Sequence, residues 1–277
     1  SIMFLCAAKH HINNWVTPAF TFPSCVVGHN FNIDILDIDI NTYTLPLDDS
    51  LLSQYNGIII TNLFGSYVDM AKWVKFCQDN NKILIFDNAA SPLSMCDGIN
   101  ICNFGDYSFG SLHHTKYLGF GEGGFIVCPM EDYDALNSIT TFGFYGTTRE
   151  YKRLSSNFKM SDVSAAFILS HIEQYNIKQH LQHQTTLVDC MLKMSHAKSF
   201  NYKPQTIYNT FPVLFDFEID EEYFCNLNIK AHKYYRPLLP LDNATELYNR
   251  IINFPLYADL TDVDIINISQ AINNAKR

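Results

Sequence analysis

A single lysine in a glycine-rich segment is the residue of this chain best placed for covalent chemistry. Lys116 closes the sequence Ser-Leu-His-His-Thr-Lys, and glycines at 119, 121, 123 and 124 follow it, ahead of a strand-like segment. Partial burial beside a strand end lowers the pKa of a lysine, and the neutral amine can then attack a carbonyl. Alone, the pattern is also typical of a solvated turn between strands, so it needs a second residue to support it.

That second residue is an aspartate about thirty positions earlier. Residues 81–87 form an apolar run of strand length that ends in Asp87 and is followed by small residues. An acid at the carboxyl end of a parallel strand faces the usual ligand crevice. Pyridoxal phosphate requires this pair, a lysine for its aldehyde and an acid that keeps its ring nitrogen protonated. At a separation of ~4 Å and an effective dielectric constant of ~20, the carboxylate and the protonated ring nitrogen attract each other by about 4 kcal/mol.

The elements that must position these two side chains alternate between apolar strands and amphipathic helices. Residues 57–61 and 83–86 are predicted strands, and Met70, Trp73 and Cys77 recur on one face of a helix between them. This unit is right-handed by the usual rule, which places Asp87 at the ligand edge of a mostly parallel α/β sheet.

The second half of the chain is predicted to be helical at first and mixed afterwards. A long helical region begins near Ser161, extends to about Lys193 and breaks near 174–176. A strand at 210–217 and a terminal helix at 262–275 indicate a small α/β lobe.

Four blocks of the chain resemble the DegT/DnrJ/EryC1/StrS family of nucleotide-sugar aminotransferases, which are fold type I pyridoxal phosphate enzymes. The third block carries the Ser-x-His-x-Thr-Lys pattern that ends at Lys116. Together with weaker similarities at 62–65 and 254–257, the blocks extend over nearly the whole chain. The four blocks, in order, are 18–22, 85–90, 111–124 and 157–166.

The resemblance implies a role for each matched residue. Lys116 would bond to the cofactor and carry the proton between substrate and cofactor carbons, and Asp87 would hold the ring nitrogen. Phe22 would stack on the cofactor ring, and Ser111 would hydrogen-bond its phosphate. Asn157 matches a phosphate ligand donated by the partner subunit, which implies a homodimer with shared active sites.

Residues near these matches are further candidates or depart from the family pattern. His113 and His114 are candidate substrate contacts or supporting residues, although His114 is equally compatible with a structural imidazole. Lys159 replaces the usual arginine, which keeps the charge but loses the bidentate fork. Ala90 stands where the family usually has Gln or His, so a hydrogen bond to the ring worth about 1 kcal/mol is missing.

The resemblance also predicts a fold type I arrangement in two parts. Residues 1–160 would form the large cofactor-binding domain, and residues 161–277 the bridging helices and the small C-terminal domain. Residues 1–8 align just downstream of the family's Ser-Gly-Thr turn, whose helix amides hold the phosphate. Because residue 1 is serine, we expect an upstream segment, so that the N-terminal part of the large domain is missing here. A truncated chain that binds cofactor poorly is the alternative.

The composition indicates a soluble globular protein. The chain has 277 residues, of which 47% are hydrophobic and 17% charged, and it lacks an apolar run long enough to span a bilayer. A net charge of -9 argues against a nucleic-acid partner, because phosphate neutralisation needs a basic face. We therefore expect neither membrane nor nucleic-acid binding.

The cysteines and the remaining histidines favour a cytoplasmic protein without a metal. Eight cysteines without a Cys-x-x-Cys pair are typical of reduced core thiols. His171, His180 and His183 have near-helical spacing but lack the glutamate of a zinc-protease helix, so no metal site is predicted there.

The resemblance implies an aminotransferase that moves an amino group from glutamate to a keto-deoxy nucleotide-sugar. Residues 142–146 are similar to the branch that makes 4-amino-4,6-dideoxyglucose, so dTDP- or UDP-4-keto-6-deoxyglucose is the expected substrate. The family's dehydratases have histidine in place of the lysine, and Lys116 argues against that reaction. A non-catalytic binding or regulatory subunit is the other alternative, suggested by Ala90 and by the absence of the Ser-Gly-Thr phosphate turn from this sequence.

Overall fold

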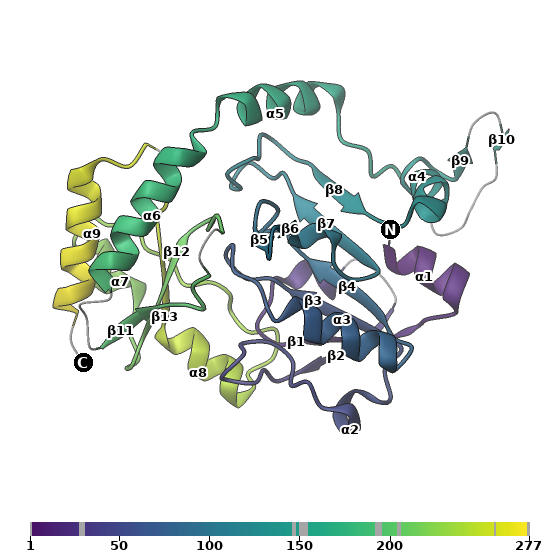
Figure 1. Cartoon of the computed structure of the whole chain (residues 1–277), viewed down its shortest axis with the longest axis horizontal. Helices are drawn as coiled ribbons and strands as arrows, with labels where there is room; N and C mark the ends of the chain where they lie inside the picture. Colours follow the sequence, from purple (N-terminus) through teal and green to yellow (C-terminus); the bar gives the residue numbers. More distant parts are fainter. Residues whose placement is uncertain are drawn as a thin grey trace.

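The computed structural model describes residues 2–27, 31–145, 148–149, 155–191, 196–203, 206–257 and 259–275. A six-stranded sheet in the order β2-β1-β3-β4-β7-β8 lies at the centre of the larger part (Figure 1). Its first five strands are parallel and β8 is antiparallel to β7, which confirms the predicted mostly parallel sheet. The strands are β1 (Asn14–Pro18), β2 (Asn32–Leu36), β3 (Gly57–Thr61), β4 (Ile83–Asp87), β7 (Tyr107–Ser111) and β8 (Gly124–Val127).

Helices cover both faces of this sheet, because successive side chains of a buried strand point to opposite faces. On one face, α3 (Met70–Asp79) packs Trp73 among side chains that include Ile58 and Phe86. On the other face, Ile59 and Ile85 belong to a core shared with α1 (Ile2–His10) and α4 (Tyr133–Thr140). All of β3 is buried, as the continuous apolar run at 57–61 predicts for a central parallel strand.

Two helices connect the larger part to the smaller one. α5 (Asp162–Gln174) begins after Ser161, whose hydroxyl accepts a hydrogen bond from the Ser164 amide, and α6 (Ile177–Met191) follows. Tyr175 is extended, so the predicted break near 174–176 is confirmed. The predicted end near Lys193 lies outside the described residues.

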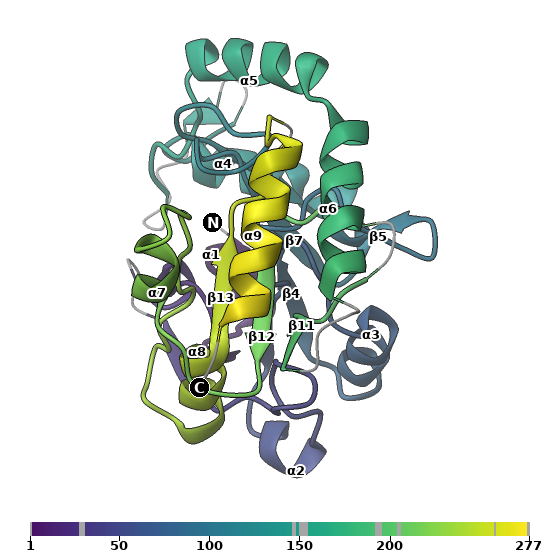
Figure 2. The same ribbon diagram turned by 90° about the vertical axis from the view of Figure 1, so that its left-hand side faces the viewer.

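The smaller part is a three-stranded antiparallel sheet with helices packed on it. Its core contains the fully buried Phe215, Phe224 and Phe254, and Figure 2 shows α9 lying along the sheet with α6 beside it. The predicted strand and terminal helix are present, and the structure adds two strands that the sequence analysis did not predict. The elements are β11 (Ala197–Ser199), β12 (Phe211–Phe215), β13 (Ile251–Phe254), α7 (Glu221–Cys225), α8 (Asp242–Arg250) and α9 (Asp262–Asn274).

An apolar cluster joins the two parts at the carboxyl edge of the central sheet. Phe20 and Phe64, which follow β1 and β3, share this cluster with Phe200, Leu214 and Leu247 of the smaller part. The contact places the smaller part over the strand ends where a ligand would bind. The boundary near residue 160 remains a prediction.

The remaining elements are short. None of the helices in the described part of the chain is both long and apolar enough to cross a membrane. The short elements are α2 (Asp49–Leu52), β5 (Met95–Cys96), β6 (Ile99–Asn100), β9 (Phe144–Tyr145) and β10 (Thr148–Arg149).

Candidate active site

The carboxyl ends of the central strands converge on a cavity of about 720 Å³. Asp87 is the last residue of β4 and is 1% exposed. Phe22 follows β1, and Lys116 lies in the loop between β7 and β8; both line the cavity. The structure therefore brings the two predicted chemical residues and the predicted ring-stacking residue to one edge of the sheet. We call this space the Lys116 cavity.

The loop that carries Lys116 is closed by its own backbone. The Leu112 amide donates to the Gly123 carbonyl at 2.9 Å, and the Lys116 amide donates to the His113 carbonyl at 2.8 Å. Gly119 is required here, because a Cβ at this position would lie 1.8 Å from the His113 carbonyl oxygen. The glycine-rich composition thus serves the tight packing of the loop rather than a flexible turn.

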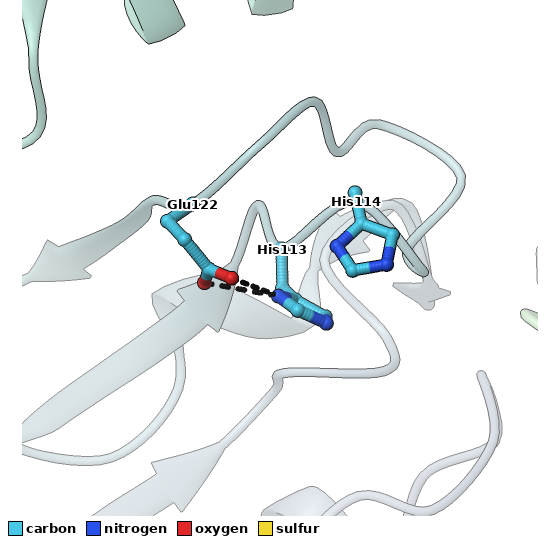
Figure 3. Close-up of side chains that lie close together, drawn as sticks. All are labelled: His113, His114 and Glu122. Carbon is cyan, nitrogen blue, oxygen red and sulfur yellow. Dashed lines mark hydrogen bonds and ion pairs between the residues drawn. The ribbon is translucent and has the colours of Figure 1, made fainter.

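The side chains of His113 and Glu122 meet across the same loop (Figure 3). His113 Nδ1 lies 2.9 Å from both carboxylate oxygens of Glu122. The ring of His114 is 4.1 Å from that of His113, and donor atoms of all three residues lie within 4.8 Å of one another. We assign the His113–Glu122 pair to holding the loop, and the expectation that the chain binds no metal stays a prediction.

Asp87 and Lys116 alter each other's protonation. Burial raises the pKa of Asp87 to about 6, although the Ala89 amide at 2.9 Å and the charge of Lys116 both act in the opposite direction. Burial also lowers the pKa of Lys116, and the charge of Asp87 opposes that change. A lysine with a lowered pKa offers a neutral amine to a carbonyl more readily than a surface lysine does.

The residues around this pair fit pyridoxal phosphate. The cofactor needs an amine for its aldehyde, a carboxylate for its pyridine nitrogen and a flat apolar surface for its ring. Lys116 and the ring of Phe22 line the cavity, and the buried Asp87 at the end of β4 interacts electrostatically with Lys116. Ser111, the predicted phosphate ligand, ends β7, and its hydroxyl accepts a 3.3 Å hydrogen bond from the His113 amide.

Of the predicted site residues, Phe22, His114 and Lys116 line the Lys116 cavity, and Asp87, Ser111, His113, Asn157 and Lys159 do not. Asn157 is exposed and is bridged to Thr141, and it is not among the residues that line the cavity. Lys159 lines a different cavity of about 570 Å³ beside α1 and α4. By contrast, His114 and Ala90 do line the Lys116 cavity, and Ala90 brings no hydrogen-bonding side chain to it.

Several aromatic residues of the cavity were missed by the sequence analysis. The ring of Tyr235 stacks on Phe64 with centroids 5.3 Å apart and meets Phe22 edge-on at 6.1 Å. Tyr235 comes from the smaller part of the chain, where no local pattern marks it as a site residue. Other cavity-lining residues outside the predicted set are Tyr117, His171, Tyr175, Asn209, Tyr234, Tyr257 and Asp259.

The three histidines with helical spacing each bond to a separate backbone carbonyl. His171 pairs with the Tyr117 carbonyl at 2.8 Å, and His180 with that of Tyr208 at 2.8 Å. His183 approaches the Tyr257 carbonyl at 3.3 Å. Within the described residues these histidines form no common ligand set.

The raised pKa of Asp87 predicts a pH-dependent stability in the cofactor-free protein. Below its ordinary value of 3.8 the carboxyl is protonated in both the folded and unfolded states, so it has no effect. Between 3.8 and about 6 the carboxyl ionises in the unfolded state but stays protonated in the folded state, so the free energy of unfolding falls across this range, and above about 6 the folded state holds a buried charge. Because each pKa unit is worth about 1.4 kcal/mol, this loss is about 3 kcal/mol.

Urea unfolding of the cofactor-free protein measures this loss. Asp87→Asn should be more stable than the wild type by about 3 kcal/mol at pH 7.5, and the difference should vanish near pH 4. The exposed Asp69→Asn variant is the matched control and should show no such trend. A difference between Asp87→Asn and wild type that stays constant with pH would contradict the assigned burial.

Comparison with known proteins identifies the class of protein that this fold and site define, a fold type I aminotransferase. The model of the DegT/DnrJ/EryC1/StrS aminotransferase family matches residues 5–273, so the chain belongs to that family, whose members depend on pyridoxal phosphate. The dTDP-4-amino-4,6-dideoxy-D-glucose transaminase of Shigella dysenteriae is 25% identical over 256 residues, which cover 83% of this chain and 69% of that protein.

Solved structures show the same fold at lower sequence identity. Helicobacter pylori PseC, an aminotransferase of pseudoaminic acid biosynthesis, has a TM-score of 0.82 and 17% identity over 94% of this chain and 79% of its own. The PLP form of Spr1654 from Streptococcus pneumoniae has a TM-score of 0.82 and 17% identity over 98% of this chain and 83% of its own. The predicted family and fold class are therefore confirmed.

Proposed function

We propose that this aminotransferase transfers the amino group of glutamate to a keto-deoxy nucleotide-sugar. The observation that carries the proposal is the electrostatic interaction of a buried carboxylate, Asp87, with a lysine of lowered pKa, Lys116, which lines the cavity at the carboxyl edge of the sheet. The sugar is proposed as 4-keto-6-deoxyglucose on a dTDP or UDP carrier, which would yield the 4-amino-4,6-dideoxy sugar. The activity of the Shigella relative supports this choice.

We assign a role in this reaction to each residue of the site. Bound pyridoxal phosphate supplies an electron sink for the carbon that gains or loses the amino group. Lys116 would hold the cofactor through its amine and, when released, move a proton to or from the substrate carbon. Asp87 would keep the ring nitrogen protonated, and Phe22 would cover one face of the ring.

The alternatives make different predictions about the same site. A dehydratase of this family would have histidine where Lys116 stands, so the lysine favours transamination. A non-catalytic subunit remains the runner-up because Ala90 leaves the cavity without a hydrogen bond to the cofactor ring. Segment 142–146, which resembles the 4-amino branch, includes Gly146, outside the described residues.

A spectrum of the loaded protein tests the proposal. After reconstitution with pyridoxal phosphate, the protein should show the visible absorption of a cofactor bonded to Lys116. Glutamate should remove that band and leave the pyridoxamine form, whereas D-glutamate, as the control, should not. A protein that shows no band after reconstitution would favour the non-catalytic subunit.

We propose in addition that two copies of the chain share their active sites. The exposed Asn157 lies outside the cavity of its own chain, where a partner's cavity could receive it. Large apolar side chains of α5 are also exposed, with Val163 at 68%, Phe167 at 51% and Leu169 at 63%. Exposed large apolar side chains gathered on one helix are typical of a protein interface, so they support a homodimer.

Mixing two inactive variants tests the shared site. Asn157→Ala should weaken phosphate binding, and Lys116→Ala should remove the reactive amine. If each site takes Lys116 from one chain and Asn157 from the other, random pairing restores about a quarter of the sites. Activity of the mixture above the sum of the separate variants is the expected result, and its absence would contradict a shared site.

A further inference from the structure

One wall of the Lys116 cavity carries a buried polar atom that has no protein partner. Oδ1 of Asn209 is buried and has no hydrogen bond to any described residue, whereas the buried Tyr117 hydroxyl lies near the backbone amide of Leu93, which acts to lower its pKa. Both residues line the cavity. Buried polar groups in folded proteins are nearly always hydrogen-bonded, so the Asn209 oxygen indicates a ligand that supplies the missing partner.

On the same wall, the hydroxyl of Tyr175 donates its proton to a hydrogen bond within the protein. His180 is fully buried, and its Nε2 lies 2.8 Å from the carbonyl oxygen of Tyr208, which can only accept, so Nε2 carries the hydrogen. Burial lowers the pKa of His180, and its neutral ring therefore leaves Nδ1 as an acceptor. The Tyr175 hydroxyl, 2.7 Å away, must donate to Nδ1. Its oxygen then offers only lone pairs to the cavity.

A carboxylate gives the same wall a negative charge. Asp259 lines the cavity, and burial together with the charge of Asp259 raises the pKa of Tyr175 to about 12. A wall with a carboxylate and an acceptor oxygen disfavours the carboxylates of an amino donor and the phosphates of a nucleotide. It favours a neutral ligand that presents hydroxyl donors, as a sugar ring does.

This wall lies beside the reactive amine. Tyr117 directly follows Lys116, and its ring centroid lies 5.9 Å from that of Tyr175 and 6.2 Å from that of His180. His171 holds the Tyr117 carbonyl at 2.8 Å, which joins the lysine loop to α5. A ligand that reacts at Lys116 is therefore within reach of the wall.

We propose that Tyr117, Tyr175, Asn209 and Asp259 form a subsite for the sugar ring, in which Tyr175 accepts a hydrogen bond from a sugar hydroxyl. We call it the hydroxyl subsite. The inference rests on the proposed function, because it names the part of the site that recognises the sugar and separates it from the part that takes the amino donor. His180 is a positioning residue, since it acts only by directing the Tyr175 proton.

Binding of unreactive nucleotide-sugars to the cofactor-loaded protein tests the subsite. UDP-glucose and dTDP-glucose lack the keto group and cannot be aminated, and UDP and dTDP lack the sugar. In titration calorimetry, Tyr175→Phe should weaken binding of the better nucleotide-sugar about tenfold, as loss of one hydrogen bond implies. Binding of the bare nucleotide and the spectral response to glutamate should be unchanged.

A second variant distinguishes loss of sugar binding from a loss of folding stability. Tyr117→Phe removes a buried hydroxyl that makes no hydrogen bond of ordinary geometry, so its melting temperature without ligand should stay close to that of the wild type. Its affinity for the nucleotide-sugar should still fall. Tyr223→Phe on α7, outside the cavity, is the matched control and should change neither quantity.

The outcomes separate the subsite from the proposed function. Unchanged nucleotide-sugar affinity in both cavity variants would overturn the subsite, as would a wild type that binds nucleotide-sugars no better than bare nucleotides. If the cavity variants lose the glutamate response but keep their affinity for the nucleotide-sugar, the wall binds the amino donor, and the proposed hydroxyl subsite is overturned. A wild type that binds nucleotide-sugars through Tyr175 but never responds to glutamate would retain the subsite and refute the transaminase proposal.

Discussion

Lys116→Ala should fold normally and lose essentially all transamination. Lys116 supplies the amine that holds the cofactor and the group that moves the proton, and no neighbouring side chain of the described loop can replace both. Loss of a covalent catalyst that also acts as the acid-base group typically slows an enzyme by about 10⁴-fold or more. The fold should not suffer, because burial lowers the pKa of this lysine and so makes its charge unfavourable in the folded state.

Three measurements check this result together. Circular dichroism should show an unchanged fold, the visible band of the reconstituted protein should be absent, and amination of the sugar should fall below detection. Lys72→Ala, which removes an exposed lysine on α3 paired with Asp69, is the control and should retain full activity. Normal turnover by Lys116→Ala would refute the assignment of the lysine.

Asp87→Asn should retain some cofactor yet turn over about 10³-fold more slowly. An amide cannot hold the proton of the pyridine nitrogen, because it lacks the negative charge that favours the protonated ring. The attraction lost is about 4 kcal/mol, which corresponds to about three decades in rate if it acts fully in the transition state. Lys116 is unaltered in this variant, so covalent attachment should persist.

A second buried carboxylate provides the matched control for Asp87. Asp132 accepts hydrogen bonds from Tyr107 and Lys9, and unlike Asp87 it is not among the charges that shift the pKa of Lys116. Asp132→Asn should therefore lower the free energy of unfolding while leaving the turnover of the folded enzyme unchanged. Asp87→Asn should do the reverse at neutral pH, with a more stable cofactor-free protein and a slower enzyme. Equal rates for Asp87→Asn and wild type would place Asp87 outside the site.

The sequence by itself determined the features that depend on local patterns. Continuous apolar runs identified β3 and β4 because a parallel strand buried on both faces leaves no room for alternation. The spacing of Met70, Trp73 and Cys77 identified α3, and the interrupted pattern near 174–176 identified the break between α5 and α6. Lys116 and Asp87 were predicted as site residues from local patterns too, Asp87 as the end of an apolar strand that faces the ligand crevice and Lys116 in the glycine-rich segment beside a strand end.

Only the tertiary structure decided which other residues join them. Tyr117, Tyr175, Asn209 and Tyr235 belong to separate segments, and they meet because the smaller part packs over the carboxyl edge of the central sheet. The same packing leaves Asn157 outside the cavity of its own chain, which its position in a family motif could not reveal. Propensity and periodicity report a residue's neighbours within a helix or strand, whereas contacts between distant segments depend on the packing of whole elements.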